Sequence, residues 1–424
     1  MVWGAAQQEL GDEDWSARVR ECLTRGGCDP DLAGRVADAS RYRQADLTDR
    51  DQLAALVQDL PDKDRSVLYC ALPPPVTARV CEGLAHLDLG GLRLALEKPF
   101  GHDLASAREL NELLASFRSE DQIFRVDHFL GEAQVLNLLG LRFANQFFEA
   151  VWSTQYVERV EIVVDETLGL EGRAGYYDGA GALIDMLQSH LLLMMAMVAM
   201  EEPARIDAVE LRDLLAHALR ATRLAGHAST ASRRARYTAG RVGERELPSY
   251  VDEPGVDADR GTETLAELDL LIDNRRWAGV PFLLRSGKAL AADRKQIVVT
   301  FRPVPFIPEG LGGTAPPNRL ILDLSPERLD LRIATNGGVN PLALGEARMS
   351  AHIGESQVRP YGEILAGILD GNPLLSVRAD VVEECWRICD PVVAAWRAGE
   401  VPLEEYPAGS EGPQGWGDPA SGRH

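Results

Sequence analysis

The chain has 424 residues, of which 45% are hydrophobic and 26% charged, and its formal net charge is -21. This length predicts two domains, and so acidic a chain, with no basic stripe, excludes nucleic acid and anionic membrane surfaces as partners. The six cysteines form no C-x-x-C pair, so neither a zinc site nor a disulfide framework is indicated, and we expect a cytoplasmic protein with reduced thiols.

Residues 1–125 alternate short apolar runs with amphipathic stretches. A β-α-β-α order of this kind is typical of a parallel sheet covered by helices, so we expect a Rossmann-like nucleotide-binding domain. Leu72-Pro73-Pro74-Pro75 ends a strand where open α/β folds bind ligands. The expected elements are a helix from Asp12 or Asp14 through Cys22, strands over Ser66–Leu72 and Leu92–Leu96, and helices over Val76–Leu87 and Leu104–Phe117.

Residues 126–405 are expected to form a larger α+β domain for substrate binding and oligomerisation. Its strands alternate in polarity and predict a mostly antiparallel sheet with helices on one face. Residues 254–261 and 303–317 are predicted loops, and residues 406–424, rich in Gly, Pro and Ser, a partly disordered tail. The expected strands are Val157–Val164, Ala266–Ile272, Gln296–Phe301, Leu320–Leu324 and Leu329–Ile333, and the expected helices are Ile184–Met200 and Ile206–Leu219.

The apolar segment Gly181–Met200 is nearly long enough to cross a bilayer. It contains Asp185, Gln188 and His190 within less than two helical turns, and polar groups at that depth are costly in lipid. We therefore expect a buried helix that presents a polar edge to a cleft, and no membrane partner. Residues 1–10 have neither the basic start nor the apolar core of a signal peptide.

Lysine is rare, since only Lys63, Lys98, Lys288 and Lys295 are lysines among 44 basic residues. An ammonium is a compact point donor that suits a sugar hydroxyl or a nicotinamide, whereas a guanidinium is a planar fork. Lys98 and Lys288 lie in short, turn-flanked motifs and are candidates for a chemical role. Chance retention is the alternative, and it is the preferred reading for Lys63.

Four longer motifs follow one another in the chain: EKPFG at 97–101, RVDHFLG at 125–131, DMLQSH at 185–190 and RWAGVPFLLRSGKAL at 276–290. With ALPP at 71–74, LRFAN at 141–145, EGR at 171–173 and YPAGS at 406–410, they resemble the glucose-6-phosphate dehydrogenase family over nearly the whole chain. The resemblance implies oxidation of the C1 hydroxyl of glucose-6-phosphate to a 6-phosphogluconolactone, the first step of the pentose phosphate pathway. It implies NADP as cofactor, with NAD as the alternative, and a homodimer or homotetramer.

His190 is the candidate general base. Oxidising a sugar hemiacetal by hydride transfer requires a group that takes the hydroxyl proton, and an imidazole with a free pKa near ~6.5 suits this task. The resemblance implies that Asp127 holds the far ring nitrogen. The alternative is a histidine whose hydrogen bonds are satisfied in the core.

The resemblance also assigns binding residues and no metal. Carboxylates such as Glu166 and Asp185 accept hydrogen bonds from paired sugar hydroxyls. For both carboxylates the alternative is an ordinary exposed side chain or a helix cap, and this alternative is stronger for Glu166. For Pro73 the alternative is a simple chain turn. The implied substrate-binding residues are Lys98, His128, Glu166, Asp185 and Lys288, and the implied cofactor-binding residues are Gln7, Pro73, Lys98 and Arg285.

Two departures from the family concern the cofactor. The family begins with a strand and a Gly-rich GxxGDL turn that places the pyrophosphate on a helix N-terminus. Here Gly4 resembles the end of the second strand, so the sheet is expected to lack a central strand, and a misplaced translation start or a truncated gene is the expected reason. Gln7 stands where the family has an arginine for the 2'-phosphate, which weakens the preference for NADP.

The third departure concerns the phosphate of the sugar. The family's D-H-Y-L-G-K stretch has Phe129 and Glu132 here in place of the phenol and the ammonium. Reversing a charge beside a phosphate costs about 4 kcal/mol at an effective dielectric of ~20 and ~4 Å. Arg125 and Arg294 are the candidates for compensation. Two alternatives stay open: a dehydrogenase for an unphosphorylated or different sugar, and a non-catalytic regulatory or scaffolding subunit without the dinucleotide cradle.

Overall fold

The computed structural model describes residues 1–337, 340–352 and 360–416. The chain divides into two compact units, Met1–Phe100 with Arg108–Arg125, and Gly101–Ala107 with Val126–His424. The first contains parallel strands with helices, and the second a larger, mostly antiparallel sheet. The predicted fold class is thus confirmed.

The strands of the first unit fall in two groups, as expected for a parallel sheet that lacks the strand between them. β1 (Trp3–Ala6) pairs in parallel with β2 (Arg41–Gln44). β3 (Val67–Cys70) pairs in parallel with β4 (Arg93–Glu97), and β5 (Ile123–Val126) follows beyond β4. The helices between strands are α1 (Asp12–Arg25), α2 (Pro30–Asp38), α3 (Arg50–Gln58), α4 (Pro74–Leu84) and α5 (Leu104–Phe117).

Two local features of this unit have clear physical causes. α4 begins at Pro74, earlier than the predicted Val76, because the fixed backbone angle of proline suits the first helical turn. Gly4 in β1 lies so close to Trp15 of α1 that a Cβ would come within 2.6 Å of the indole ring. The absence of a side chain at Gly4 therefore allows α1 to pack on β1.

The second unit is built on a ten-stranded sheet in the order β16-β15-β14-β13-β6-β12-β11-β8-β18, with β7 paired to β11. Only β6 with β12 and β8 with β18 run parallel among its described pairs. The strands are β6 (Val157–Asp165), β7 (Thr222–Leu224), β8 (Ser232–Thr238), β11 (Leu265–Ile272), β12 (Phe282–Gly287), β13 (Arg294–Phe301), β14 (Arg319–Leu324), β15 (Glu327–Asn336), β16 (Leu344–His352) and β18 (Leu403–Pro407).

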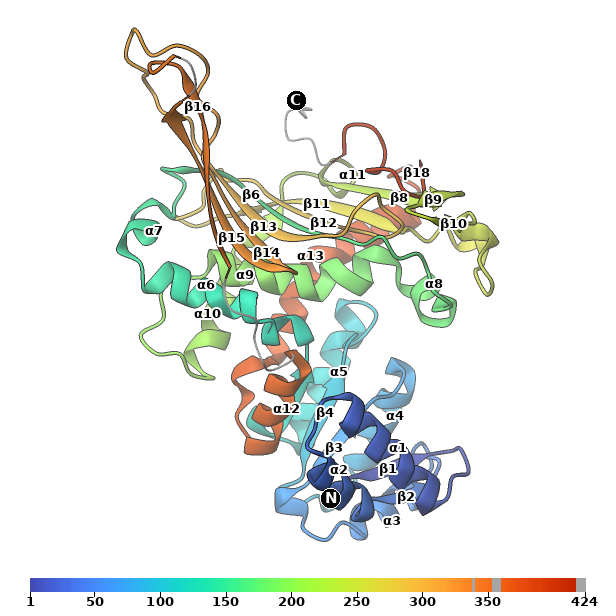
Figure 1. Ribbon diagram of the computed structural model, residues 1–424. Coiled ribbons are helices and arrows are strands. Elements are labelled where there is room, and N and C mark those ends of the chain that lie inside the picture. The colour runs from blue at the N-terminus through green and yellow to red at the C-terminus, as the bar shows by residue number, and fades with distance from the viewer. Residues whose placement is uncertain (338–339, 353–359, 417–424) are drawn as a thin grey trace. The chain divides into compact units, whose positions relative to one another are not determined.

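Helices cover one face of this sheet, with α6, α9, α10 and α13 on the same side in Figure 1. α10 begins at Glu210, later than the predicted Ile206. Asp207 accepts hydrogen bonds from the backbone N–H groups of Val209 and Glu210, which holds the preceding residues in a cap instead of a helical turn. The helices are α6 (Ala133–Phe143), α7 (Gln146–Val151), α8 (Ala174–Ala182), α9 (Leu192–Ala199), α10 (Glu210–Arg220), α11 (Ala228–Ala231), α12 (Pro360–Asp370) and α13 (Ala379–Arg397).

The predicted helix Ile184–Met200 consists of two segments with different geometry. Leu183–Leu191 is a π-helix and continues into α9. In an α-helix, residues five apart point about 140° away from each other, whereas π-helical hydrogen bonds join residues five apart. Asp185 and His190 are therefore one turn apart. The stretch Ala174–Ala199 is long and apolar enough to cross a membrane by length and composition alone, but 89% of its most apolar window is buried within the protein.

The π-helix is anchored at its start by Glu263, which precedes β11. One carboxylate oxygen of Glu263 accepts a hydrogen bond of 2.9 Å from the N–H of Leu183. Gly181, near the end of α8, interrupts the helical backbone with a φ of 65°, and a Cβ there would come within 2.2 Å of that same oxygen. Burial raises the pKa of Glu263 to about 7, although Arg234 and backbone N–H groups oppose the shift.

Glu263→Gln should change how stability depends on pH. The pKa of Glu263 is about 7 in the folded chain, above its ordinary value of 4.5. The native chain should therefore lose stability as the pH rises from about 4.5 to about 7, because the folded state disfavours the ionised carboxyl group. The variant should gain roughly 3 kcal/mol of unfolding free energy relative to the native chain over that interval. Urea unfolding of both at pH 5 and pH 8 measures this. A difference that is the same at both pH values would contradict the assignment.

The carboxyl-terminal segment packs against the sheet up to Trp416. The Trp416 indole is 7% exposed, lies 4.5 Å below the Arg233 guanidinium, and donates to Glu404 at 3.1 Å. This aromatic anchor holds residues 407–416 in place despite their Gly and Pro content. Residues 417–424 lie outside the described residues.

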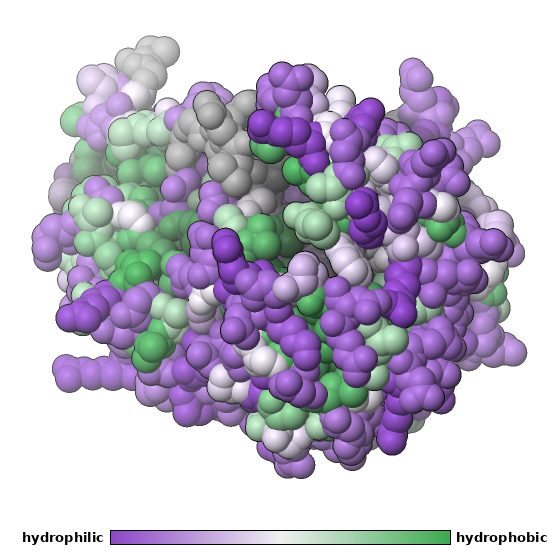
Figure 2. All heavy atoms as spheres, turned by 90° about the horizontal axis from the view of Figure 1, so that it is seen from below, coloured by the Kyte–Doolittle hydropathy of each residue, from purple (hydrophilic) through white to green (hydrophobic). Residues whose placement is uncertain are grey.

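The surface agrees with the high share of charged residues. The face in Figure 2 is largely hydrophilic, with apolar side chains gathered in several patches.

All six cysteines are free thiols. Burial raises the pKa of four of them, Cys70, Cys81, Cys385 and Cys389.

Candidate active site

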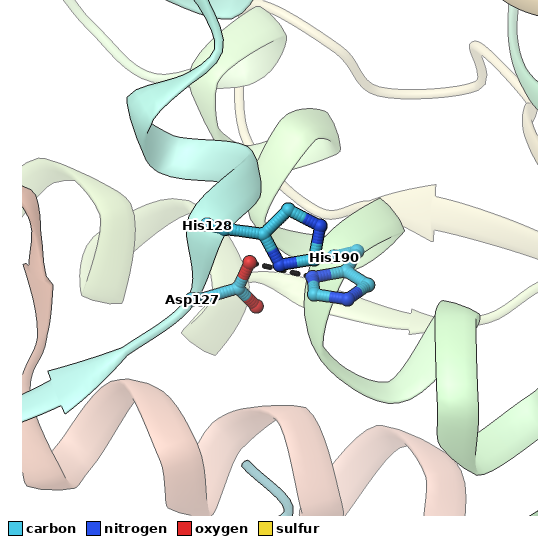
Figure 3. A group of neighbouring side chains, drawn as sticks. All are labelled: Asp127, His128 and His190. Atoms are coloured by element: carbon cyan, nitrogen blue, oxygen red, sulfur yellow. Dashed lines mark hydrogen bonds and ion pairs between the residues drawn. The ribbon is translucent and has the colours of Figure 1, made fainter. Parts of the chain in front are cut away.

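His190 and Asp127 form a buried hydrogen-bonded pair. Nδ1 of His190 lies 2.5 Å from Oδ1 of Asp127, and the side chains are 1% and 0% exposed. Figure 3 shows the imidazole at the π-helix and the carboxylate at the end of β5 turned toward each other. Because Asp127 takes Nδ1, Nε2 is the ring nitrogen directed away from this carboxylate.

Two further donors hold the Asp127 carboxylate. Ser189, the residue before His190, donates its hydroxyl to Oδ2, and the N–H of Phe129 donates to Oδ1 at 3.1 Å. Asp127 thereby caps the short turn His128–Gly131 while it contacts His190. Sequence reasoning missed Ser189, although its place beside His190 in the DMLQSH motif was a signal.

Aromatic rings enclose the imidazole. The Phe129 ring stacks on His190 with centroids 4.1 Å apart, and His128 meets it edge-on at 4.7 Å. Tyr361 of α12 stacks on His128 at 5.2 Å. Phe129, which the sequence marks only as a lost phosphate ligand, therefore fixes the plane of His190.

The same cluster has the geometry of a metal site. Donor atoms of Asp127, His128 and His190 all lie within 4.8 Å of one another. However, the direct bond between Asp127 and Nδ1 of His190 occupies two of these donors with each other. The expectation that the site holds no metal remains a prediction.

A second polar group gathers around Lys288, which follows β12. Its ammonium donates to Glu166 at 2.7 Å and lies 5.3 Å from the centre of the Tyr177 ring. Lys295 of β13 approaches the other oxygen of Glu166 at 3.8 Å. Glu166 and Lys288 are 24% and 12% exposed, so this ion pair is partly accessible to a ligand.

Asp185 of the π-helix joins this group through tyrosines. Burial, together with the charge of Asp185 and a hydrogen bond to it, raises the pKa of Tyr176. Burial and then the Asp185 charge also raise the pKa of the neighbouring Tyr177. Asp185 is 7% exposed. Sequence reasoning missed both tyrosines, although they lie three and four residues after Arg173, the end of the EGR motif.

Comparisons with known proteins cover both parts of the chain. Residues 1–137 match the glucose-6-phosphate dehydrogenase NAD binding domain, and residues 139–420 match the glucose-6-phosphate dehydrogenase C-terminal domain. This chain belongs to the glucose-6-phosphate dehydrogenase family. It is an oxidoreductase of that family, and its cofactor class is a nicotinamide dinucleotide.

Individual relatives agree with this membership. The glucose-6-phosphate 1-dehydrogenase of Gluconobacter oxydans is 37% identical over 97% of this chain and 87% of its own length. A crystal structure of the Mycobacterium avium enzyme is 34% identical, with a TM-score of 0.85 over 97% of this chain and 87% of that chain. A glucose-6-phosphate dehydrogenase in complex with glucose-6-phosphate is 30% identical, with a TM-score of 0.84 over 97% and 88%.

Glu132 stands where the resemblance implies a lysine, and Lys295 is the cation that acts on it. Arg125 is 0% exposed and pairs with Glu120 and Asn111, and Arg294 pairs with Asp165. Compensation by either arginine therefore remains a prediction. Lys295 holds down the pKa of Glu132, which burial raises.

Arg285 lies in a cluster of buried ions in the sheet of the second unit. Its guanidinium is 1% exposed and pairs with Asp165 at 3.1 Å, with Glu267 at 3.3 Å and with the backbone carbonyl of Glu411 at 2.8 Å. These partners explain why an arginine is held in the interior. Its predicted contact with the cofactor remains a prediction.

In the first unit, Gln7, Pro73 and Lys98 follow β1, β3 and β4, at the carboxyl ends where a parallel sheet binds ligands. The Lys98–Pro99 peptide is cis. These positions fit the nucleoside and nicotinamide parts of a dinucleotide. The pyrophosphate fits less well, because α1 has acidic residues throughout its first turn and α4 starts with prolines that lack an N–H.

Proposed function

We propose that this chain oxidises glucose-6-phosphate at C1 to 6-phosphogluconolactone, with NADP as the preferred cofactor, as the first step of the pentose phosphate pathway. The observation that carries the proposal is the buried contact of 2.5 Å between His190 and Asp127. A base of this kind, oriented by a carboxylate, is what removal of a hydroxyl proton requires.

In this mechanism Nε2 of His190 takes the proton of the C1 hydroxyl. Asp127 stabilises the positive charge that then develops on the imidazole, and Phe129 keeps the ring plane fixed. When bound, the nicotinamide dinucleotide supplies hydride acceptance. Loss of proton and hydride from the C1–OH unit leaves a carbonyl, so the product is the lactone.

Five residues are proposed to hold the sugar phosphate. Glu166 and Asp185 accept hydrogen bonds from ring hydroxyls, as carboxylates do with paired OH donors. The ammonium groups of Lys288 and Lys98 supply charged donors, and His128 completes the set. Support comes from the Lys288 to Glu166 contact of 2.7 Å and from the Tyr176 and Tyr177 link to Asp185.

On the cofactor side we propose Gln7, Pro73, Lys98 and Arg285 as contacts. Gln7 offers the adenosine 2'-phosphate a hydrogen bond but no charge, so discrimination between NADP and NAD should be small. We also propose a cytoplasmic homodimer or homotetramer, and a division into domains at residues 1–125, 126–405 and 406–424.

The test is absorbance at the reduced-nicotinamide band with glucose-6-phosphate or glucose, each combined with NADP or NAD. Turnover is expected with glucose-6-phosphate. A preference for glucose would support the alternative, based on Glu132, that the substrate is an unphosphorylated sugar. No turnover with any of the four combinations would overturn the proposal.

A further inference from the structure

We propose that Glu263 is a positioning residue that caps the π-helix and thereby holds Asp185 in its sugar-binding position. This inference rests on the proposed function, because it assigns Asp185 to substrate binding. Glu263 lies just before β11 and is 80 residues away in sequence from Leu183, at the start of the π-helix that it caps.

The π-helix needs a cap from outside its own segment. Helix starts leave backbone N–H groups without intrahelical partners, and a short polar side chain normally accepts from them. Here the preceding residue is Ala182, which provides no side-chain cap. Glu263 supplies the missing acceptor at 2.9 Å from the N–H of Leu183, and a carboxylate also suits the positive end of the helix dipole.

The chain around the cap is shaped to admit the carboxylate. Only a residue without Cβ leaves the space that Glu263 occupies beside Gly181, where a Cβ would approach the carboxylate oxygen to 2.2 Å. Backbone bonds fix the same junction, since the N–H of Ala182 donates to the carbonyl of Glu263 at 3.3 Å. The Thr262 hydroxyl donates to the carbonyl of Asp178 at 2.7 Å.

The segment that carries Glu263 also sets the position of Lys288. The N–H of Lys288 donates to the carbonyl of Thr264 at 2.9 Å. The Tyr406 hydroxyl lies 2.8 Å from the hydroxyl of Thr264 and donates to the carbonyl of Lys288 at 2.7 Å. Residues 262–264 thus connect the two elements that hold Asp185 and Lys288.

Burying this carboxylate is unfavourable because it loses hydration, and its surroundings offset little of that free energy. Glu263 is 7% exposed, and the described residues place no cation within ion-pair distance of it. Arg234, the cation that acts on it, donates to the carbonyl of Val401. A buried carboxylate outside any ion pair needs another reason, and the hydrogen bond to Leu183 supplies one.

Asp185 and His190 should respond differently when the cap is lost. Asp185 is two residues after the capped N–H of Leu183, whereas His190 is seven residues after it. His190 is held from outside the helix by Asp127 at 2.5 Å and by the Phe129 ring. Loss of Glu263 should therefore weaken substrate binding more than it slows the chemical step.

The experiment compares steady-state kinetics of Glu263→Ala, Glu263→Gln and Gly181→Ala with the native full-length protein. Removing the cap should raise KM for glucose-6-phosphate about 10-fold while kcat changes less than about 3-fold, given what a cap contributes. Glu263→Gln keeps an acceptor oxygen and should recover most of the affinity. Asp259→Ala, an exposed carboxylate in the preceding loop, is the matched control and should match the native protein.

The pair Gly181 and Glu263 provides a second arm if Glu263→Ala folds poorly. Gly181→Ala should displace the carboxylate and raise KM, and the double variant should be no worse than the worse single, because both remove one interaction. A kcat loss with unchanged KM, additive singles, or a glutamine variant as impaired as alanine would overturn the inference. Calorimetric titration with glucose-6-phosphate separates the two proposals, since absence of binding by the native chain would overturn the proposed function itself.

Discussion

His190→Asn is expected to abolish turnover while leaving glucose-6-phosphate binding nearly unchanged. The asparagine amide can still donate to Asp127 in place of Nδ1, so the buried carboxylate keeps a partner. What is lost is Nε2, the atom that takes the C1 proton. General base catalysis contributes about 10²- to 10⁴-fold, and kcat should fall by that amount or more.

The measurement is kcat by absorbance together with the dissociation constant of glucose-6-phosphate by calorimetry. His217→Asn is the matched control, because His217 is an exposed histidine in the last turn of α10. It should behave as the native chain. Unchanged turnover in His190→Asn would remove His190 as the base, and equal losses in both variants would point to a general effect on folding.

Glu132→Lys is expected to tighten binding of glucose-6-phosphate. Glu132 is half-buried, and its pKa is raised by that burial, so a charge here is poorly screened. Reversing its sign beside the sugar phosphate is worth about 4 kcal/mol at ~4 Å and an effective dielectric of ~20. Partial exposure and repulsion from Lys295 reduce that figure, and we expect the dissociation constant to fall about 10- to 100-fold.

Two comparisons make this measurement specific. Glucose, which has no phosphate, should bind the native chain and Glu132→Lys alike. Glu132→Gln removes the negative charge without adding a positive one and should give an intermediate affinity for glucose-6-phosphate. An unchanged or weaker affinity of the lysine variant would contradict the placement of the phosphate beside Glu132.

Much of the fold could be predicted because the signals are local. α5 begins and ends at the predicted residues Leu104 and Phe117, and β14 begins one residue before the predicted Leu320. Periodicity predicts such elements, because side-chain direction follows residue number along a helix or strand. The candidates His190 and Asp127 came from motifs, and the structure brings them together, while their catalytic roles remain proposals.

The cation that acts on Glu132 could not be predicted in the same way. Arg294 and Lys295 are neighbours on β13, and successive side chains of a strand point to opposite faces. Which of the two lies on the side of Glu132 depends on the register of β13 against β6. A local sequence pattern does not specify the register between strands that are distant in the chain.

By itself, the sequence determined the order of strands and helices, the acidic surface and the motifs that identify the family, since each depends on residue type and spacing. Tertiary structure alone decided the rest of the site. The π-helical turn that puts Asp185 and His190 one turn apart depends on Gly181 and on a cap from Glu263, which is 80 residues away from Leu183. No local propensity reports such a contact, because its free energy arises only once the sheet has brought the two segments together.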